Sequence, residues 1–334
     1  MRTGISCVDR RTLLLGAGGV LLAGRAHAEP LSSDPVTEAG LDDIQLTRNL
    51  FTRVATQVSI NGTGPFSFVI DTGSVSTAVS DTLARQLALP LRESLMVHGI
   101  AAATVTPGVG VGRLTLQGMT ARNLHSPVLP RDQLGADGLI GLDILGRFKL
   151  GFDTERRTAS LQRETMRIIS GGTERVGTRL SREGLRTTRG RLGQLIITDL
   201  RISGQPAVAF VDSGAQYSIG NPALMEAIRA RRLDGLVASR DIPVFGVTGH
   251  SVQATMARVA DLRLGAHRLG QTTLLFADMH CFRALHLSDR PALLIGADLL
   301  GRFRRVVIDF ARNSVAFDGL RPPSLSTLDD LASV

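Results

Sequence analysis

Short runs of alternating apolar and polar residues follow one another along most of the chain. Two of the longest, residues 109–129 and 254–277, are broken only by glycine or polar residues, a pattern typical of strands with one buried face. In residues 59–70 and 201–211, glycine and proline separate runs rich in Val, Ile and Phe, which predicts a tight hairpin in each. The pattern therefore predicts an all-β protein built from antiparallel sheets.

Helical spacing is confined to two short segments. Residues 81–89 contain a capping residue and helical spacing, and Pro90 ends them. Asn221 supplies a cap and Pro222 the first helical position for residues 223–233. Residues 278–286 show neither period and predict an irregular loop.

The same order of elements occurs twice. In both halves a hairpin leads into a turn that begins with Asp, and a helix, several strands and a Leu-Ile-Gly segment follow. The turns are "DTGS" at residues 71–74 and "DSGA" at residues 212–215, each at the end of an apolar run. The later segments are "GLIGLDILGRFKLGFD", residues 138–153, and "LLIGADLLGRFRRVVIDF", residues 293–310. A repeat of this length indicates a duplicated β-domain.

Composition and charge narrow the class of protein. The chain has 334 residues, enough for two domains that each bury a core. Its net charge of +8 is spread along the chain and carried almost entirely by arginine, and only 4% of the residues are aromatic. A nucleic-acid site needs clustered positive charge, and a single-stranded one also needs stacking side chains, so we expect no nucleic-acid partner.

The first 28 residues have the features of an export signal. Arg10 and Arg11 precede a weakly apolar, glycine-rich stretch, and small residues at Ala26 and Ala28 suit a signal peptidase. This resembles a twin-arginine signal, and it predicts a bacterial product that is periplasmic or secreted, without stable membrane insertion after cleavage. An ordinary secretory signal or an uncleaved anchor remains an alternative.

The repeat and the leader together divide the chain. We predict a signal peptide, an N-terminal lobe, a basic connection between the lobes, a C-terminal lobe and a tail, at residues 1–28, 29–161, 162–193, 194–320 and 321–334. Part of the N-terminal segment, residues 29–46, is a candidate prosegment.

Cysteine usage bears on redox and metal chemistry. Cys7 would leave with the leader, so Cys281 stands alone and no intrachain disulfide forms in the mature chain. No activated-cysteine pattern surrounds Cys281, and His280, Cys281 and His286 match no common zinc spacing. We expect neither metal nor cofactor, and a thiol nucleophile or a zinc site here is a minor alternative.

The two Asp turns suggest a specific chemistry. Glycine lets one backbone approach another closely, and the preceding hydroxyl can bond across to a partner turn. A pseudo-twofold arrangement would then bring Asp71 and Asp212 face to face. Two carboxyls in contact share one proton, and such a pair can activate water for attack on a carbonyl carbon.

These motifs resemble those of the retropepsin-like and pepsin-like aspartic proteases. The likeness extends over residues 46–318 and rests on four signatures in order, the two Asp turns and the two Leu-Ile-Gly segments. The resemblance implies a bilobal acid-protease fold, with two duplicated retropepsin-like β-barrel lobes that each carry a short helix. It looks like a single-chain, two-lobe bacterial member, so no dimer is required for a complete site.

The resemblance also implies roles for individual residues. Asp71 and Asp212 would be the catalytic pair, and Thr72, Gly73, Ser74, Ser213, Gly214 and Ala215 would support it. Thr72 and Ser213 would cross-link the turns, while the two glycines would line the base of the cleft. Candidate flap residues that close over a peptide are His98, Gly99, Ile100, Phe245, Gly246 and Val247.

Some family features are missing. The only tyrosine is Tyr217, so the flap tyrosine of pepsin-like enzymes is absent, and Val75 and Gln216 stand where retroviral enzymes have Asp. The turns also differ at their fourth position. A Ser74 hydroxyl bonded to Asp71, with no counterpart at Ala215, would place the negative charge preferentially on Asp71.

We therefore predict an aspartic endopeptidase that hydrolyses extended peptide or protein substrates. The alternative is a non-catalytic peptide-binding or scaffold protein that keeps the fold. A phosphate-binding loop at residues 108–112 is disfavoured, because no Lys-Ser/Thr pair or helix follows it.

Overall fold

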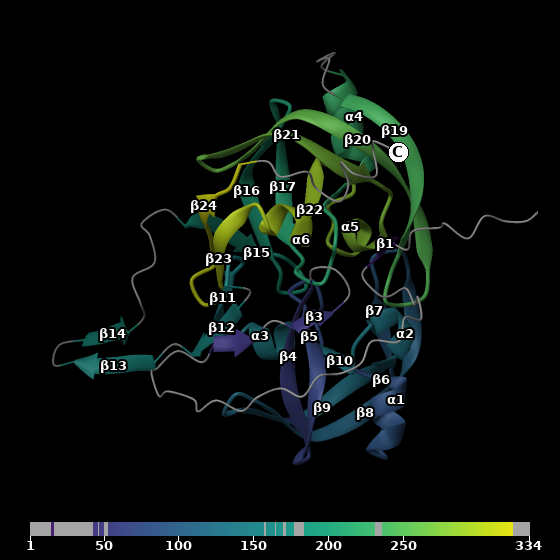
Figure 1. Cartoon of the computed structure of the whole chain (residues 1–334), viewed down its shortest axis with the longest axis vertical. Coiled ribbons are helices and arrows are strands. Elements are labelled where there is room, and N and C mark those ends of the chain that lie inside the picture. Colours follow the sequence, from purple (N-terminus) through teal and green to yellow (C-terminus); the bar gives the residue numbers. More distant parts are fainter. Residues whose placement is uncertain are drawn as a thin grey trace, which may run out of the picture.

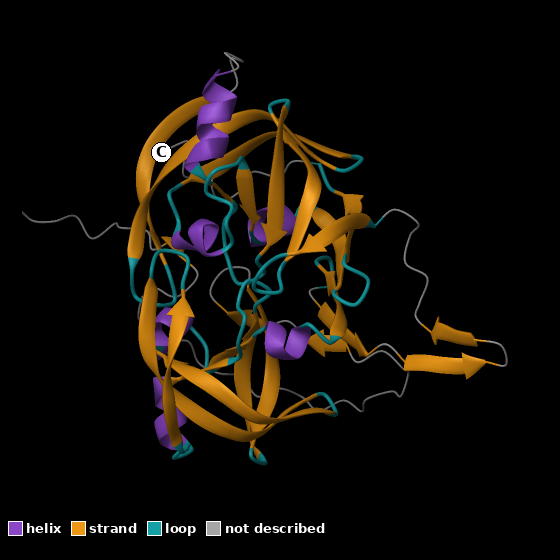
Figure 2. Cartoon of the chain, turned by 180° about the vertical axis from the view of Figure 1, so that it is seen from behind, coloured by secondary structure: helices purple, strands orange, loops and turns teal. Residues whose placement is uncertain are grey.

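Two strand-rich lobes lie one above the other in Figure 1, the N-terminal lobe below and the C-terminal lobe above. This computed structural model describes residues 15–16, 43–45, 47–49, 53–156, 158–163, 165–169, 172–176, 184–230 and 236–322. Seen from behind, the few helices are short and are set around the two sets of strands (Figure 2). The observed architecture confirms the predicted bilobal, duplicated all-β fold.

An eight-stranded sheet forms the N-terminal lobe. Its strands, in the order β3-β4-β5-β10-β6-β9-β8-β7, are β3 (Thr47–Asn49), β4 (Arg53–Ile60), β5 (Thr63–Ile70), β6 (Ala78–Ser80), β7 (Leu91–His98), β8 (Ala103–Leu116), β9 (Met119–Leu129) and β10 (Gly138–Ile140). Its helices are α1 (Asp81–Gln86), α2 (Arg131–Leu134) and α3 (Leu142–Leu145).

The C-terminal lobe repeats this arrangement. Its strands are β16 (Leu195–Ile202), β17 (Gln205–Val211), β18 (Ile219–Gly220), β19 (Leu236–Phe245), β20 (Ser251–Leu264), β21 (His267–Phe276) and β22 (Ala292–Ile295). Its helices are α4 (Pro222–Ala230), α5 (His280–Ala284) and α6 (Ala297–Leu300). Each lobe thus carries two helices of four or five residues besides the one that the sequence predicts.

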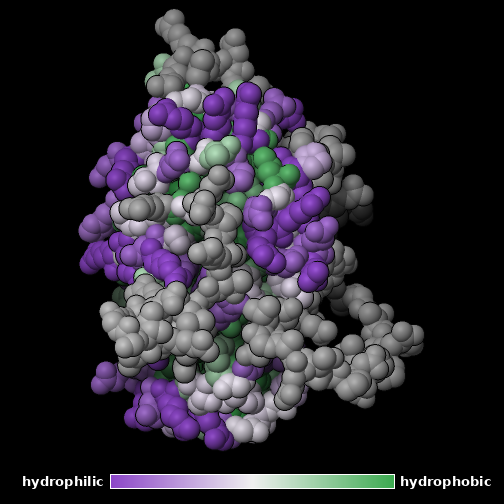
Figure 3. Space-filling model, turned by 90° about the vertical axis from the view of Figure 1, so that its left-hand side faces the viewer, coloured by the Kyte–Doolittle hydropathy of each residue, from purple (hydrophilic) through white to green (hydrophobic). Residues whose placement is uncertain are grey.

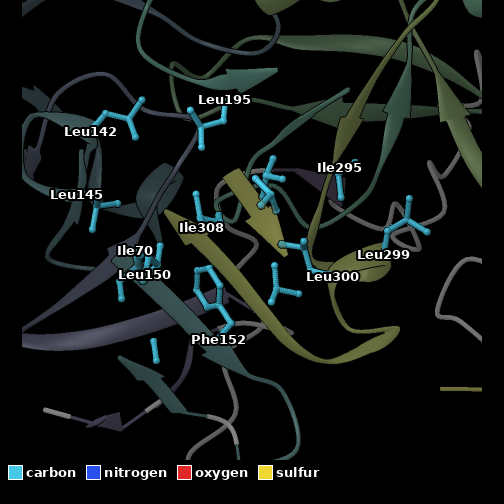
Figure 4. Close-up of a cluster of buried hydrophobic side chains, with 14 of the residues drawn as sticks. Ile70, Leu142, Leu145, Leu150, Phe152, Leu195, Ile295, Leu299, Leu300 and Ile308 are labelled. Carbon is cyan, nitrogen blue, oxygen red and sulfur yellow. The ribbon is translucent and has the colours of Figure 1, made fainter. Parts of the chain in front are cut away.

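A shared sheet joins the lobes. It contains β2 (Asp43–Gln45), β11 (Phe148–Asp153), β12 (Thr158–Arg163), β15 (Leu185–Arg189), β23 (Phe303–Asp309) and β24 (Ser314–Leu320). Strands β11 and β23, one from each copy of the repeat, pair antiparallel with Leu150 opposite Ile308. Residues of both lobes meet in one buried cluster at this point, as Figure 4 shows for Ile70 and Ile295 around β11 and β23.

The remaining strands lie at the margins. β1 (Leu15–Gly16) pairs with β19, while β13 (Thr165–Ile169) and β14 (Gly172–Val176) form a two-stranded hairpin that projects from the body (Figures 1 and 2). On the face drawn in Figure 3, hydrophilic side chains dominate the part of the surface that is coloured, and apolar patches show between them.

A strand insertion in each lobe positions the Asp turns. β10 lies between β5 and β6, parallel to β5 and antiparallel to β6, and β22 lies likewise between β17 and β18. The chain that leaves β5 or β17 must therefore turn around the inserted strand. Each turn starts with an Asp whose backbone N–H donates to the inserted strand, Asp71 to Ile140 at 3.0 Å and Asp212 to Ile295 at 2.9 Å.

The two predicted hairpins form with the tightest kind of turn. Asn61 and Gly62 join β4 to β5, Ser203 and Gly204 join β16 to β17, and all four residues have positive φ. Two successive positive φ values suit the right-handed twist of the flanking strands. The prolines that follow lie inside β5 and β17 rather than in the turns, which corrects one detail of the prediction.

Both predicted helices occur, and both are capped. The side chain of Ser80 accepts the N–H of Leu83 at 3.0 Å, so the first cap lies one residue before the predicted segment. Asn221 accepts the N–H of Leu224 at 2.9 Å, as predicted. The prediction of an irregular loop at residues 278–286 was wrong, because these residues contain α5, whose Phe282 is buried in the C-terminal lobe.

Several predictions concern residues that are only partly described. Of the predicted signal segment, only residues 15–16 are described, and most of the candidate prosegment and the tail after residue 322 lie outside the described residues. Within the described ranges, no helix has the length and apolar character needed to cross a membrane.

Candidate active site

Two side-chain hydroxyls lock the Asp turns together. Thr72 donates its hydroxyl to the carbonyl of Val211 at 2.9 Å, and Ser213 donates its own to the carbonyl of Ile70 at 2.9 Å. Each hydroxyl oxygen also accepts the backbone N–H of the other residue: Oγ1 of Thr72 accepts that of Ser213 at 3.0 Å, and Oγ of Ser213 accepts that of Thr72 at 3.1 Å. All four bonds are buried, and they join residues about 140 positions apart, so the turns are held at one geometry.

The two carboxyl groups are oriented alike. Oδ1 of each accepts two N–H bonds from its own turn, at 2.9 and 3.0 Å for Asp71 and at 2.9 and 3.1 Å for Asp212. Both residues are buried, at 7% and 6% exposure. These bonds fix the orientation of each carboxyl within its own turn.

Glycine brings each carboxyl close to the opposite turn. A Cβ atom on Gly73 would lie 2.4 Å from Cγ of Asp212, and one on Gly214 would lie 2.5 Å from Cγ of Asp71. No larger residue fits at either position. Each carboxyl therefore lies directly against the glycine of the opposite turn.

A second hydroxyl–aspartate pair supports each turn from behind. The hydroxyl and N–H of Thr77 donate to Asp143 at 2.7 and 3.0 Å, and those of Ser218 donate to Asp298 at 2.6 and 3.0 Å. Each hydroxyl oxygen also accepts the N–H of the glycine in the Leu-Ile-Gly segment, at 3.1 and 2.9 Å. Our sequence analysis missed both aspartates, although each lies two residues after that glycine in both copies of the repeat.

The supporting pair of the C-terminal lobe has shifted acidities. Burial raises the pKa of Asp298 to about 6, against the lowering effect of its hydrogen bonds from Ser218. Burial and the nearby charge of Asp298 raise the pKa of Tyr217 to about 12. Tyr217, which is 5% exposed, therefore stays a neutral part of the lobe's core.

The predicted role of the Ser74 hydroxyl was wrong. It donates to the carbonyl of Ser76 at 2.9 Å, and only the backbone N–H of Ser74 reaches Asp71. The N–H of Ala215 makes the equivalent bond to Asp212. The difference between serine and alanine at the fourth position therefore adds no hydrogen bond to either carboxyl.

The two candidate flap segments are hairpin ends that meet each other. His98 ends β7 and Phe245 ends β19, and the turns that follow come together. A Cβ on Gly99 would lie 2.8 Å from Oγ1 of Thr248, and one on Gly246 would lie 3.0 Å from Cγ1 of Ile100. His98, Gly99, Ile100 and Val247 line the cleft, whereas Phe245 and Gly246 do not.

The N-terminal hairpin also docks on α5 of the opposite lobe. The carbonyl of Ile100 accepts the N–H of Cys281 at 3.4 Å, and Nδ1 of His98 lies 2.9 Å from Nε2 of His280. The ring centres are 5.2 Å apart and the planes differ by 1°. This separation is about the N–N distance plus two ring radii, so the rings are coplanar and share one in-plane N–H···N bond.

The cleft between the turns and the hairpins has a volume of about 230 Å³. Besides Asp71 and Asp212, its floor includes Gly73 but not Gly214. Its walls are mostly apolar, with Leu95, Ile100, Leu129, Leu139, Phe210 and Leu285 among them. No arginine, lysine or glutamate of the described residues lines it, so the cleft suits apolar side chains next to a polar centre.

Two residues of the turn between β15 and β16 line this cleft, and the sequence analysis did not predict them. Leu192 and Gln194 both line it, and Nε2 of Gln194 donates to the carbonyl of Gly73 at 3.2 Å. Nothing in the local sequence distinguishes them from other residues of a glycine-rich turn.

The minor alternatives find little support. Cys281 lines the cleft, but burial and then the negative charge of Asp212 raise the pKa of its thiol, which keeps it protonated. Among the described side chains, no three His, Cys, Asp or Glu residues are arranged to hold a metal. Residues 108–112 lie inside β8, so they form no phosphate-binding loop.

Comparison with known proteins identifies the family of this chain. A profile of the family described as aspartyl protease matches residues 56–144 and 198–299, which together make up more than half of the chain. A similar solved structure is a retropepsin-like aspartic protease from Rickettsia conorii, with 20% identity over 39% of this chain and 96% of that chain and a TM-score of 0.29. No curated protein matches. The profile matches one Asp turn and one Leu-Ile-Gly segment in each half, and the chain therefore belongs to the aspartyl protease family.

Proposed function

We propose that the protein is an aspartic endopeptidase whose catalytic pair is Asp71 and Asp212. The observation that carries the proposal is the reciprocal bonding of Thr72 and Ser213, which holds each carboxyl against the glycine of the opposite turn. Two buried carboxyls that share one proton supply both an acid and a base at the same point.

The reaction moves two protons, the one that the pair shares and one from the attacking water. The ionised carboxyl takes a proton from a water molecule as its oxygen attacks the peptide carbonyl carbon, while the protonated carboxyl donates to the carbonyl oxygen. The resulting tetrahedral intermediate collapses when its C–N bond breaks and the amine nitrogen receives a proton from the first carboxyl. The carbonyl oxygen returns its proton to the second, and the pair again holds one proton.

The proposed substrate is an extended peptide with apolar side chains beside the scissile bond. The mostly apolar walls favour such side chains, and no arginine, lysine or glutamate of the described residues lines them. The hairpin ends at residues 98–103 and 245–251 would cover the bound peptide, with His98, Gly99, Ile100 and Val247 nearest to it.

A peptide-library cleavage assay tests this function. The mature chain is compared with Asp71→Asn and Asp212→Asn across the acidic and neutral pH range. Asp289→Asn, an exposed position outside the cleft, is the matched control. We expect cleavage by the wild type and the control and none by the other two. Cleavage that survives either change would refute the pair, and peptide binding without cleavage would favour the non-catalytic alternative.

We also propose that the protein acts outside the cytoplasm of a bacterium. The support is the leader with Arg10 and Arg11 before a weakly apolar stretch. Fractionation should find the shortened chain in the periplasm or medium, and Arg10→Lys with Arg11→Lys should retain it inside. Unchanged export of that variant would argue for an ordinary secretory signal.

A further inference from the structure

The side-chain amide of Gln194 is buried, and only its nitrogen makes a hydrogen bond. Its side chain lines the cleft and the residue is 3% exposed. Nε2 donates to the carbonyl of Gly73, yet Oε1 is fully shielded and has no hydrogen-bond partner among the described residues. Buried amide oxygens are almost always paired, because an unpaired one costs about 1–3 kcal/mol.

The orientation of the amide follows from its neighbour. If oxygen and nitrogen were exchanged, Oε1 would face the carbonyl oxygen of Gly73, and two acceptors would meet. The backbone of Gln194 is held as well, since its carbonyl accepts the N–H of Gly190 at 2.7 Å in the turn between β15 and β16. The unbonded atom is therefore an acceptor, and its partner must be a donor.

The position of this acceptor identifies the donor. Gly73 lies between the two carboxyls, with its N–H on Asp71 and its Cα against Asp212. Gln194 covers the carbonyl that Gly73 would otherwise present to a peptide in the cleft. No described side chain covers the carbonyl of Gly214 in this way, so the two turns differ in what they present.

We propose that a bound peptide displaces the atoms that shield Oε1 of Gln194, so that this oxygen accepts one main-chain N–H of the peptide on the side of the cleft next to Gly73. The amide then makes two hydrogen bonds: the peptide N–H donates to Oε1, and Nε2 donates to the Gly73 carbonyl. A substrate with proline or an N-methylated residue at that position would be excluded, because it has no N–H to donate. The inference rests on the proposed peptidase function and deepens it.

The test is an ester scan of a cleaved peptide. Each backbone N–H near the scissile bond is replaced in turn by an ester oxygen, and kcat/KM is measured for the wild type and for Gln194→Leu. In the wild type we expect one position at which the ester lowers kcat/KM roughly tenfold, the worth of one hydrogen bond. With Gln194→Leu the all-amide peptide should lose about the same factor, and the ester at that position should cost nothing further.

Two further variants separate recognition from structural support. Gln194→Glu should work only at pH values at which its carboxyl is protonated, since only that form can donate to Gly73 and accept from the peptide. Gln205→Leu, at the start of β17 and outside the cleft, is the matched control and should keep the wild-type ester profile. Gln194→Leu should change the unfolding temperature little, because it removes an unpaired oxygen together with the Nε2–H bond to the Gly73 carbonyl.

The outcomes distinguish this inference from the function on which it rests. If Asp71→Asn and Asp212→Asn are inactive but Gln194→Leu keeps the full ester profile, the pair is supported and the role of Gln194 is refuted. If the wild type cleaves nothing, the same scan is read as peptide affinity, and an unchanged profile or no binding refutes the inference. A large loss of stability in Gln194→Leu would assign Gln194 to holding the turn alone.

Discussion

In the N-terminal lobe the chain leaves β5 at Asp71, and in the C-terminal lobe it leaves β17 at Asp212, with the same bonds in both turns. Each carboxyl accepts two N–H groups of its own turn, and each turn is supported by a hydroxyl that bonds an aspartate of the helix after the Leu-Ile-Gly segment, α3 or α6. The cross-links between Thr72 and Ser213 are reciprocal. Apart from Gln194, which bonds the carbonyl of Gly73 alone, the hydrogen bonds of the two turns have therefore kept their twofold symmetry.

The walls of the cleft have not kept this symmetry. In the C-terminal lobe α5 faces the cleft with Cys281, Ala284 and Leu285, whereas α2 of the N-terminal lobe contributes nothing to its lining. The N-terminal wall comes instead from β7 and the hairpin after it, residues 95–100. A proton-sharing pair depends on equal geometry on both sides, while a peptide has a direction and different side chains, so the walls are free to differ.

The symmetry of the floor predicts the largest effect. Gly73→Ala and Gly214→Ala should each lower kcat/KM by at least about hundredfold, because the new Cβ must displace the opposite carboxyl by about 1 Å. The two losses should be of similar size. Steady-state kinetics would check this, with Gly184→Ala, whose nearest neighbour is 3.7 Å away, as the control. A loss in only one variant would contradict a symmetric floor.

The cross-link should matter next. Thr72→Val keeps the shape but removes the hydroxyl, and Ser213→Ala does nearly the same in the other turn. Each leaves the carbonyl and the N–H that the hydroxyl served without a partner, so we expect the free energy of unfolding to fall by about 2 kcal/mol or more. Thr72→Ser, which keeps the hydroxyl, should lose much less. Chemical denaturation would measure all three, and equal stability of Thr72→Val and Thr72→Ser would rule out the hydroxyl as the cause.

The free energy of unfolding should depend on pH through Asp298, which supports the C-terminal Asp turn. The pKa of Asp298 is about 6 in the folded chain and 3.8 ordinarily, so the folded state binds this proton more tightly. Its contribution to stability is full below pH 3.8 and is lost as the pH rises through 6. Because the residue is partly exposed, the change should be only ~1 kcal/mol. Asp298→Asn should flatten this part of the curve of unfolding free energy against pH.

The variant in the other lobe serves as the comparison. Asp143→Asn replaces the equivalent carboxylate with a neutral amide. It therefore shows how much stability either lobe loses simply through the changed hydrogen bonds with Thr77 or Ser218. That loss shifts the whole curve, whereas titration changes its slope. A slope between pH 4 and 6 that persists in Asp298→Asn would mean that another group causes it.

The contact between the hairpin and α5 should give the smallest effect. Burial, His98 and the positive charge of Arg283 lower the pKa of His280. While the two rings are hydrogen-bonded, the pair therefore takes up a second proton poorly. Acid should favour opening of the contact between the hairpin and α5. Arg283 is itself paired with Asp278. Hydrogen exchange of residues 98–103 should rise severalfold between pH 7 and pH 5 after correction for intrinsic rates, because the shared N–H···N bond fails when both rings are charged.

Replacing the ring of His280 should remove the pH dependence of hydrogen exchange. In His280→Leu, exchange of residues 98–103 should be faster at pH 7 and should change little with pH, while His250→Gln, in the opposite hairpin, should behave like the wild type. If acid still accelerates exchange in His280→Leu, the histidine pair does not control the hairpin.

The sequence alone determined the strands, both hairpins, the duplication and the two Asp turns. Period-two alternation, positive-φ residues such as Asn61 and Gly62, and caps such as Asn221 act over a few residues, so they can be recognised without the fold. The repeat allowed the paired site to be predicted, because two copies of an Asp-Thr/Ser-Gly turn form one site when they face each other.

Contacts between distant residues were decided by the tertiary structure. The Ser74 hydroxyl was expected to bond Asp71, but in the folded turn it donates to the carbonyl of Ser76. The segment around Phe282 has no helical period, yet packing in the C-terminal lobe makes it a helix that faces the cleft. Gln194 lies 121 positions from Gly73 in the chain, and only the folded lobes bring its amide to the floor between the carboxyls.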